Sequence, residues 1–240
     1  MPRAHRHFLA GHVWHITHRC HKKEFLLKFA KDRDLWRHWL FEARKRYGLC
    51  VFNYIITSNH IHLLVRDRGH GEISKSMQLI AGRTAQEYNR RKHRNGAYWE
   101  DRYHATAVET DTHLLRCMVY IDLNMVRAGV IKHPADWAWS GYHEIQSPPG
   151  RYRVIDQQEL MKLLDITHYG QLQQHHKEQV ENMLASVHHD RDPRWSSSIA
   201  VGLREYVDSI KHALGISGKY KHTAEENGSY VLREALVPYA

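Results

Sequence analysis

Short stretches in which hydrophobic and polar residues alternate occur throughout the first two thirds of the chain. A period of two sends every second side chain to the same face and is typical of a half-buried β-strand. Ser58-Asn59 separates two of these stretches and predicts a turn, so the strands that flank it should form a hairpin. We expect strands at 12–20, 49–57 and 60–65, and a mostly extended segment at 97–109.

Between these strands, apolar residues recur every three or four positions, which predicts amphipathic helices. Asp34 is a good N-cap for the first helix, and Gly48 is a good stop because glycine readily adopts a left-handed conformation. The order β-α-β-β-α-β followed by an extra helix predicts an α+β fold of the ferredoxin-like type, an antiparallel sheet with helices on one face. The three helices are expected from Asp34 to Gly48, from Glu72 to the break at Asn95-Gly96, and from Asp111 to Gly129.

The composition changes after the aromatic segment Trp137-Ala-Trp-Ser-Gly-Tyr142, and Ser147-Pro-Pro-Gly150 is typical of a turn or linker. We therefore expect an N-terminal domain at 1–146 and a mostly helical C-terminal extension at 151–240. The features of the extension are a capping pattern at Asp156 and Glu159, a glutamine- and histidine-rich helix at 169–186, a helix at 199–214 capped by Ser198, and a weakly patterned end at 218–240.

The chain carries a formal charge of +9 at pH 7 and has a sequence pI near 9.5. This favours a polyanionic partner, because neutralising phosphates releases condensed counterions, although a basic protein without such a partner fits the charge as well. The chain has no run of about 18 apolar residues, no apolar stretch of the secretory type at its start, and no CxxC spacing among its three cysteines. We therefore expect a cytoplasmic protein without a membrane span, a disulfide framework or a cysteine zinc site.

The third predicted strand contains His60-Ile61-His62 among apolar neighbours. Residues i and i+2 of a strand project to the same face, so the two imidazoles should stand side by side, about 7 Å apart along the strand. Two neutral imidazoles in this arrangement can occupy two positions on one divalent ion. A pair of structural histidines fits the same pattern, since the chain has 22 histidines.

The third predicted helix carries a polar side beside its apolar one, and Tyr120 and Asn124 on that side are four positions apart and therefore neighbours. A phenol is a poor nucleophile until its proton is removed or its target is polarised, and a divalent ion can polarise a scissile phosphate. Two histidine ligands, with the Asn124 oxygen as a third, would leave room on the ion for that phosphate. A half-buried packing tyrosine is the alternative.

Basic and aromatic residues follow the second predicted helix. Single-stranded nucleic acid is typically held by a basic groove with stacking side chains, and a solvated helix end explains the basic run equally well. The candidates for DNA contact, together with two arginines of the third helix, are Arg90, Arg91, Lys92, Arg94, Trp99, Arg102, Tyr103, Arg116 and Arg127.

Five segments in a fixed order and spacing carry a family resemblance that covers about residues 5–145. They are His12-Val-Trp-His-Ile-Thr-His-Arg19, Tyr54-Ile-Ile-Thr-Ser-Asn-His-Ile-His-Leu-Leu-Val65, Trp99-Glu-Asp-Arg-Tyr-His104, Tyr120-Ile-Asp-Leu-Asn-Met-Val-Arg-Ala-Gly129 and Trp137-Ala-Trp-Ser-Gly-Tyr142. Together they resemble the IS200/IS605-like single-tyrosine (Y1, HUH) transposases, and specifically the REP-associated tyrosine transposase branch.

The resemblance implies that His60 and His62 hold Mg²⁺ or Mn²⁺, that Asn124 is a third ligand, and that Tyr120 is the nucleophile. The substrate would be single-stranded DNA whose imperfect palindromes fold into hairpins. Cleavage would leave a covalent 5′-phosphotyrosine and a free 3′-hydroxyl, which can be rejoined. In one departure, the family's usual Asn-Pro-Val-Arg is Asn124-Met-Val-Arg127 here. The C-terminal extension would be either an accessory DNA-binding region or a brace for the core.

Three other interpretations remain. Histidine-triad hydrolases need a third alternate histidine, and position 64 is leucine; two-histidine phosphoesterases need a second copy of a motif that occurs once, as His15-Ile-Thr17. A domesticated relative that binds DNA hairpins without cutting them is the stronger alternative.

Relatives include both dimers and monomers, and the long extension favours a monomer over a homodimer.

Overall fold

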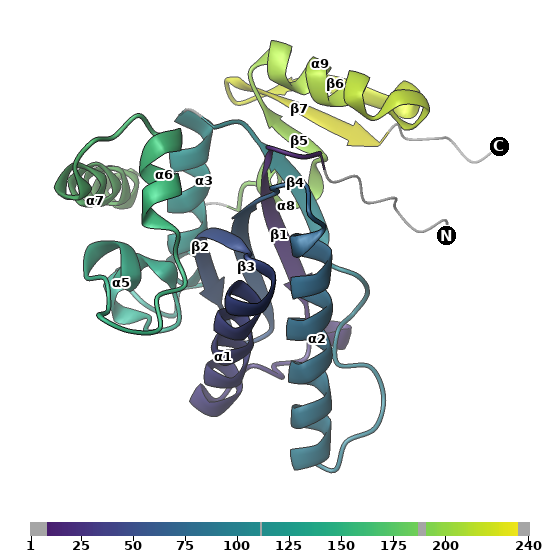
Figure 1. The fold of residues 1–240 in the computed structure, drawn as a ribbon, viewed down its shortest axis with the longest axis vertical. Coiled ribbons are helices and arrows are strands. Elements are labelled where there is room, and N and C mark those ends of the chain that lie inside the picture. The colour runs from purple at the N-terminus through teal and green to yellow at the C-terminus, as the bar shows by residue number, and fades with distance from the viewer. Residues whose placement is uncertain (1–8, 111, 187–190, 235–240) are drawn as a thin grey trace.

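The structure, a computed structural model, describes residues 9–110, 112–186 and 191–234. Its centre is a seven-stranded sheet in the order β2-β3-β1-β4-β5-β7-β6 (Figure 1). Neighbouring strands are antiparallel, except that β4 and β5 run parallel. The strands are β1 (Val13–Arg19), β2 (Cys50–Ile56), β3 (His60–Arg66), β4 (His104–Val108), β5 (Ala200–Gly202), β6 (Lys221–Glu226) and β7 (Ser229–Glu234).

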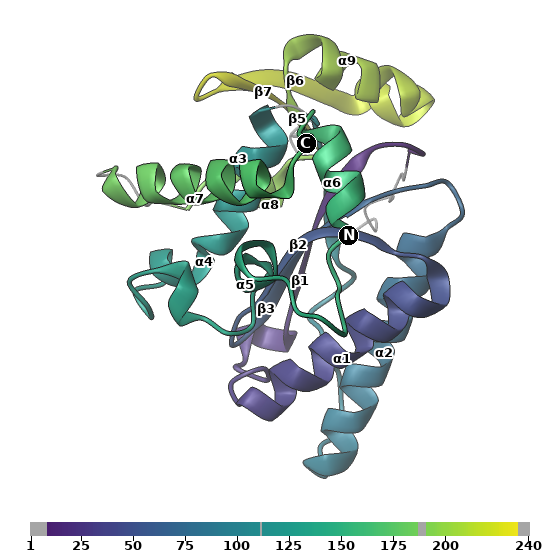
Figure 2. The same ribbon diagram turned by 60° about the vertical axis from the view of Figure 1, so that its left-hand side comes forward.

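Helices cover both faces of this sheet. α1 and α2 lie against one face, and α3, α5, α6 and α7 gather on the other side (Figures 1 and 2). None of the described helices combines the length and apolar character needed to cross a bilayer. The helices are α1 (Ala30–Tyr47), α2 (Glu72–Arg91), α3 (Thr112–Asp122), α4 (Asn124–Arg127), α5 (Gly141–Gln146), α6 (Gln157–Leu163), α7 (Tyr169–Ala185), α8 (Arg194–Ser197) and α9 (Arg204–Ala213), with 3₁₀ turns η1 (His21–Lys23), η2 (Pro134–Asp136) and η3 (Gly215–Tyr220).

The order of β1, α1, β2, β3, α2 and β4 confirms the predicted ferredoxin-like α+β fold. Antiparallel pairing sets Thr17 opposite His62 and Arg19 opposite His60. Paired residues share a face, so the two histidines lie on the face away from α1 and α2, while Ile61 and Leu63 point to the other face and are fully buried. The alternation seen in the sequence therefore separates the core from the polar side of β3.

The first helix begins earlier than predicted. Phe29 is its N-cap, and Asp34, which we expected in that position, lies inside the helix and accepts hydrogen bonds from Arg37 and from the Trp139 indole, at 2.9 and 3.0 Å. The aspartate is thus held by tertiary partners that local sequence does not show. Gly48 ends the helix at φ 70°, as expected.

The third predicted helix is interrupted. α3 ends at Asp122 and α4 begins at Asn124, because Leu123 leaves the helical conformation with φ −79° and ψ 4°. The break occurs without a proline, since residue 125 is methionine. Gly129 adopts φ +67° and ends this region as predicted, whereas Asp111, the expected N-cap, lies outside the described residues.

The C-terminal extension contains the expected helical part and also adds three strands to the sheet. Strand β5 precedes α9, so Ser198 does not cap a helix as we predicted, and Leu203 occupies that position. The weakly patterned end forms the hairpin β6–β7 around Asn227-Gly228, a dipeptide that tolerates the positive φ values of 49° and 71° found there. Because β5 pairs with β4, the two predicted domains share one sheet, and the boundary between 146 and 151 stays a prediction.

A buried hydrogen-bond network joins α3 to β2 and α7. The Asp122 carboxylate, which is 0% exposed, accepts a bond from Asn53 Nδ2 at 3.0 Å and lies 2.7 Å from His176 Nε2. Gln146 Nε2 donates to His176 Nδ1 at 3.0 Å, so the imidazole proton is on Nε2, facing Asp122. Because Asp122 lies two residues after Tyr120, this network anchors α3 close to the tyrosine.

Replacing His176 with leucine should lower the free energy of unfolding by about 3–5 kcal/mol, because it leaves a buried carboxylate without its main donor. Urea unfolding followed by circular dichroism measures the change. The matched control is His175→Leu, on the exposed neighbouring position of α7, where we expect a change within about 0.5 kcal/mol. Equal losses in the two variants would show that the network does not stabilise α3.

Candidate active site

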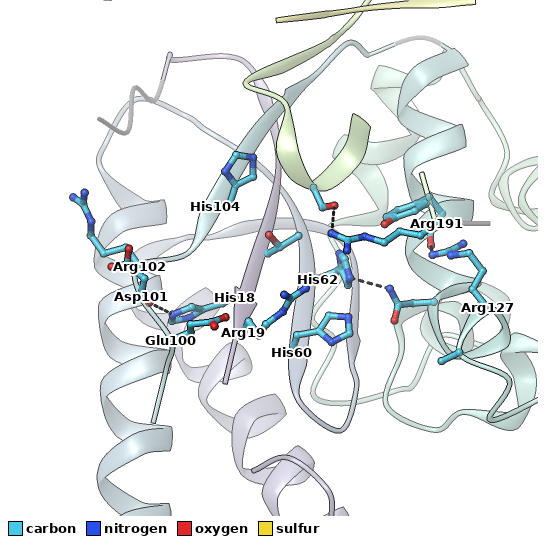
Figure 3. Close-up of a pocket in the computed structure, with 15 residues that line it drawn as sticks. His18, Arg19, His60, His62, Glu100, Asp101, Arg102, His104, Arg127 and Arg191 are labelled. Atoms are coloured by element: carbon cyan, nitrogen blue, oxygen red, sulfur yellow. Dashed lines mark hydrogen bonds between the residues drawn. The ribbon is translucent and has the colours of Figure 1, made fainter. Parts of the chain in front are cut away.

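A cavity of about 450 Å³ opens at the end of the sheet where β1 ends and β3 begins. In Figure 3, His60 and His62 stand at its centre, Arg127 and Arg191 lie on one side, and Glu100, Asp101 and Arg102 lie on the other. The predicted site residues that line the cavity are His60, His62, Arg102, Tyr120, Asn124 and Arg127.

The His60 imidazole presents its Nε2 lone pair to the cavity. Its Nδ1 lies 2.7 Å from the Asn59 side-chain oxygen, which can only accept a hydrogen bond, so the ring proton is on Nδ1. The orientation of the Asn59 amide is supported by its nitrogen, which donates to the Lys23 carbonyl at 3.1 Å. The turn that precedes β3 therefore selects the tautomer of the first histidine.

A second chain of hydrogen bonds selects the same tautomer in His62. The Trp195 carbonyl accepts from His15 Nδ1 at 2.6 Å, which leaves His15 Nε2 as an acceptor. His15 Nε2 lies 2.8 Å from His62 Nδ1, so His62 donates this bond and keeps its lone pair on Nε2. The two rings stack with centroids 5.0 Å apart and an interplanar angle of 14°.

Burial keeps these histidines neutral. Loss of hydration lowers the pKa of His60 to about 4, with a further contribution from the Arg19 charge. Burial also lowers the pKa of His15 to about 3, and holds the pKa of His62 well below its usual value together with the neighbouring His15 and His60. The rings of His60 and His62, 5.0 Å apart between centroids, thus offer two neutral nitrogen donors near pH 7.

Asn124 completes this group. Its Nδ2 lies 2.9 Å from His62 Nε2 and donates to that lone pair. Rotation of the amide about its terminal bond would turn the oxygen toward the same place. Throughout the described parts of the chain, no cluster of three His, Cys, Asp or Glu side chains is suited to a metal ion.

Tyr120 lies on α3 beside the histidines and is 8% exposed. Its ring centroid is 5.9 Å from that of His62, and the Arg127 guanidinium lies 4.1 Å over its face. Burial raises the pKa of Tyr120, while the charges of Arg127 and Arg191 act to lower it. The phenol therefore keeps its proton at neutral pH, and the arginines favour the phenolate once it forms.

Three side chains of this site belong to the C-terminal extension and were not predicted. The Trp195 ring lies 6.2 Å from that of Tyr120 between centroids, and the backbone carbonyl of Trp195 accepts the hydrogen bond from His15. Arg191 and Ser196 line the cavity and are joined by a hydrogen bond of 3.1 Å. No local pattern marks these residues. For His15, the signal was its alternation with Thr17, but the sequence did not show that β1 pairs with β3.

The basic run at the end of α2 and just beyond it does not line the cavity. Arg91 pairs with Asp32, and Arg94 pairs with Glu24 at 3.5 Å. Arg90, Lys92 and, on α3, Arg116 are exposed.

The two aromatic candidates pack inside the protein. Trp99 stacks on His18 with centroids 4.1 Å apart and donates to the Ala81 carbonyl, and Tyr103 is buried. Of the predicted DNA contacts, the structure thus brings only Arg102 and Arg127 to the cavity with Tyr120, and all nine contacts stay predictions.

Comparisons with known proteins agree with the motifs. The family model described as "Transposase IS200 like" matches residues 9–124. A solved structure described as "the REP associates tyrosine transposase bound to a REP hairpin" is similar with a TM-score of 0.52 and 18% identity, over 64% of this chain and 90% of that chain. This likeness shows the fold.

A putative transposase from Deinococcus radiodurans R1 matches more weakly, with a TM-score of 0.34 and 16% identity over 43% of this chain and 83% of that chain. No protein with a curated function shows significant sequence similarity. The matched residues 9–124 include the histidine pair, Tyr120 and Asn124. Residues 9–124 of the chain therefore match the IS200-like transposase family, as the motifs predicted.

Proposed function

We propose that this protein is a metal-dependent single-strand DNA endonuclease and transposase, which cuts and rejoins DNA at hairpin-forming sites through a covalent 5′-phosphotyrosine on Tyr120. The observation that carries the proposal is the convergence of two neutral imidazole nitrogens, one tyrosine and four arginines on one cavity. The arginines are Arg19, Arg102, Arg127 and Arg191.

The donor set fits Mg²⁺ or Mn²⁺. His60 and His62 would hold the ion through Nε2, and Asn124 through its side-chain oxygen, which is the type of donor that such ions prefer. His15 and Asn59 would keep both rings in the ligating tautomer. When bound, the ion supplies charge that polarises the scissile phosphate.

Tyr120 would attack the phosphorus through its phenolic oxygen. One bond forms between that oxygen and phosphorus, and the bond from phosphorus to the 3′ oxygen breaks, so the departing strand ends in a 3′-hydroxyl that takes up the proton lost by the phenol. Arg127 and Arg191 stabilise negative charge on the phenol oxygen. The exchange conserves the phosphodiester linkage, so the reverse reaction rejoins the strand without another energy source.

We propose single-stranded DNA that forms hairpins as the substrate, as for the similar solved transposase, which is bound to a REP hairpin. The net charge of +9 and the arginines around the cavity support a polyanionic ligand. We also propose that the protein acts as a monomer, because Trp195 and Ser196 of the extension reach Tyr120 of the same chain.

Covalent trapping tests the proposed function. With hairpin oligonucleotides from the gene's own flanks, the wild type should form a denaturant-resistant protein–DNA band in Mn²⁺ or Mg²⁺ and none in EDTA. Tyr120→Phe and His62→Ala should reduce the band at least about a thousandfold. Tyr47→Phe, at the partly exposed end of α1, serves as the matched control and should leave it unchanged.

Two results of this experiment would contradict the proposal. A covalent band that survives Tyr120→Phe would mean that another residue is the nucleophile. Hairpin binding without a covalent band in either metal would instead support a protein that binds DNA hairpins and does not cut them.

His15→Leu should weaken Mn²⁺ binding by about 10- to 100-fold, because it removes the acceptor that fixes the proton of His62 on Nδ1. Isothermal titration measures the affinity, and long-range ¹H–¹⁵N spectra report the tautomer of His62. His15→Gln, whose amide oxygen can accept the same bond, should restore part of the affinity. His12→Leu, at the position just before β1 and outside the cavity lining, is the control. An unchanged affinity in His15→Leu would show that His15 does not position the ligand.

A further inference from the structure

Two exposed phenylalanines lie among lysines between β1 and α1. Phe25 is 65% exposed and Phe29 is 56% exposed, which is unusual for side chains of this size. The amino groups of Lys28 and Lys92 lie 5.9 and 5.3 Å from the centre of the Phe29 ring. We refer to Lys22, Lys23, Phe25, Lys28, Phe29 and Lys92 as the lysine–phenylalanine surface.

This surface adjoins the cavity. Asn59, which holds His60, donates to the Lys23 carbonyl at 3.1 Å, and the Leu27 amide donates to the Ser58 carbonyl at 2.9 Å. The segment that carries the phenylalanines therefore lies directly against the turn before β3. The end of α2, which Lys92 directly follows, and the start of α1 lie at the same end of the molecule (Figure 1).

The backbone of this surface is strained. Lys22 and Lys23 have φ values of 50° and 59°, in the left-handed region that residues other than glycine and asparagine seldom adopt. Two consecutive lysines in this conformation persist only where surrounding contacts hold them, and such strain gathers at ligand-binding segments. The hydrogen bond that the Asn59 side-chain amide donates to the Lys23 carbonyl is one of these contacts.

The charge of the surface is uncompensated. Among the residues that the structure describes, its four lysines form no ion pair with a carboxylate. The acidic residues nearest in the chain are already engaged, since Glu24 pairs with Arg94 and Asp32 with Arg91. The surface therefore combines a positive charge with two open aromatic faces.

We propose that the lysine–phenylalanine surface binds the single-stranded DNA that continues from the cavity, with unpaired bases stacked on Phe25 and Phe29 and phosphates near the lysines. Aromatic faces beside a basic track are the chemistry that holds single strands without reading their sequence. Bases paired within a duplex are stacked on one another and offer no free face. This inference rests on the proposed function, because the single-stranded DNA is the part of the substrate that leaves the cavity. Its test measures binding and does not need cleavage.

The first measurement is fluorescence anisotropy of a labelled oligo-dT, which forms no hairpin, in EDTA. Phe25→Ala/Phe29→Ala should weaken binding at least about fivefold, since one stacked base contributes about 1 kcal/mol or more and that energy corresponds to this factor. Ile216→Ala/Tyr220→Ala removes two equally exposed apolar side chains from η3, at 77% and 69% exposure, and should leave binding unchanged. The affinity for a duplex of the same length should be the same in the wild type and in both double variants.

The second measurement is the salt dependence of the same binding. Lys22→Gln/Lys23→Gln should reduce the slope of log K against log salt concentration by about 1.4, because each phosphate contact on a single strand contributes about 0.7. Lys75→Gln/Lys219→Gln removes two exposed lysines outside the surface and should leave the slope unchanged. All substituted side chains are exposed, and thermal melting verifies that the variants fold.

Covalent trapping in parallel separates the two proposals. Weaker oligo-dT binding in the phenylalanine variant supports this surface, even if the wild type forms no covalent band and the proposed function fails. Unchanged oligo-dT binding in both the phenylalanine and the lysine variants overturns the surface, even if the covalent band forms and the function holds. An equal loss of duplex binding overturns the assignment to single strands.

Discussion

The hydrogen-bond chain from the Trp195 carbonyl through His15 to His62 is the constraint on which the candidate site depends. A carbonyl oxygen can only accept, so each later donor and acceptor in the chain is determined, and the lone pair of His62 has to face the cavity. Burial keeps the pKa of His15 and His62 low, so neither ring gains the second proton that would break this order. A backbone group of the extension thereby controls the chemistry of a side chain on β3.

The sheet makes this chain possible. Its register brings β1 beside β3 with Thr17 opposite His62, and its α1–α2 face takes the apolar side chains, which leaves the other face for polar groups. Helix α3 then sets Tyr120 over that polar face, and the buried contacts of Asp122 with Asn53 and His176 fix the helix where it approaches the histidines. The break at Leu123 lets Asn124 reach His62 from a separate short helix.

The C-terminal extension is part of the site as well as of the sheet. Parallel pairing of β4 with β5 places α8 and the segment before it next to Tyr120, where Arg191 offsets part of the effect of burial on its pKa. Positive charge is concentrated at this end of the molecule, around the cavity and on the lysine–phenylalanine surface beside it.

The sequence by itself determined the order of elements in the N-terminal part, the pairing of His60 with His62 on one face, and the family, because periodicity and motif spacing are local properties of the chain. The position of Asp34 inside α1, the break at Leu123 and the strand β5 were decided by tertiary contacts and backbone geometry that no local pattern encodes. The same holds for the placing of Trp195, His15 and His62 in one chain of hydrogen bonds, since it joins residues 180 and 47 positions apart. Only the packing of β1, β3 and the extension around a common cavity brings such distant residues within bonding distance.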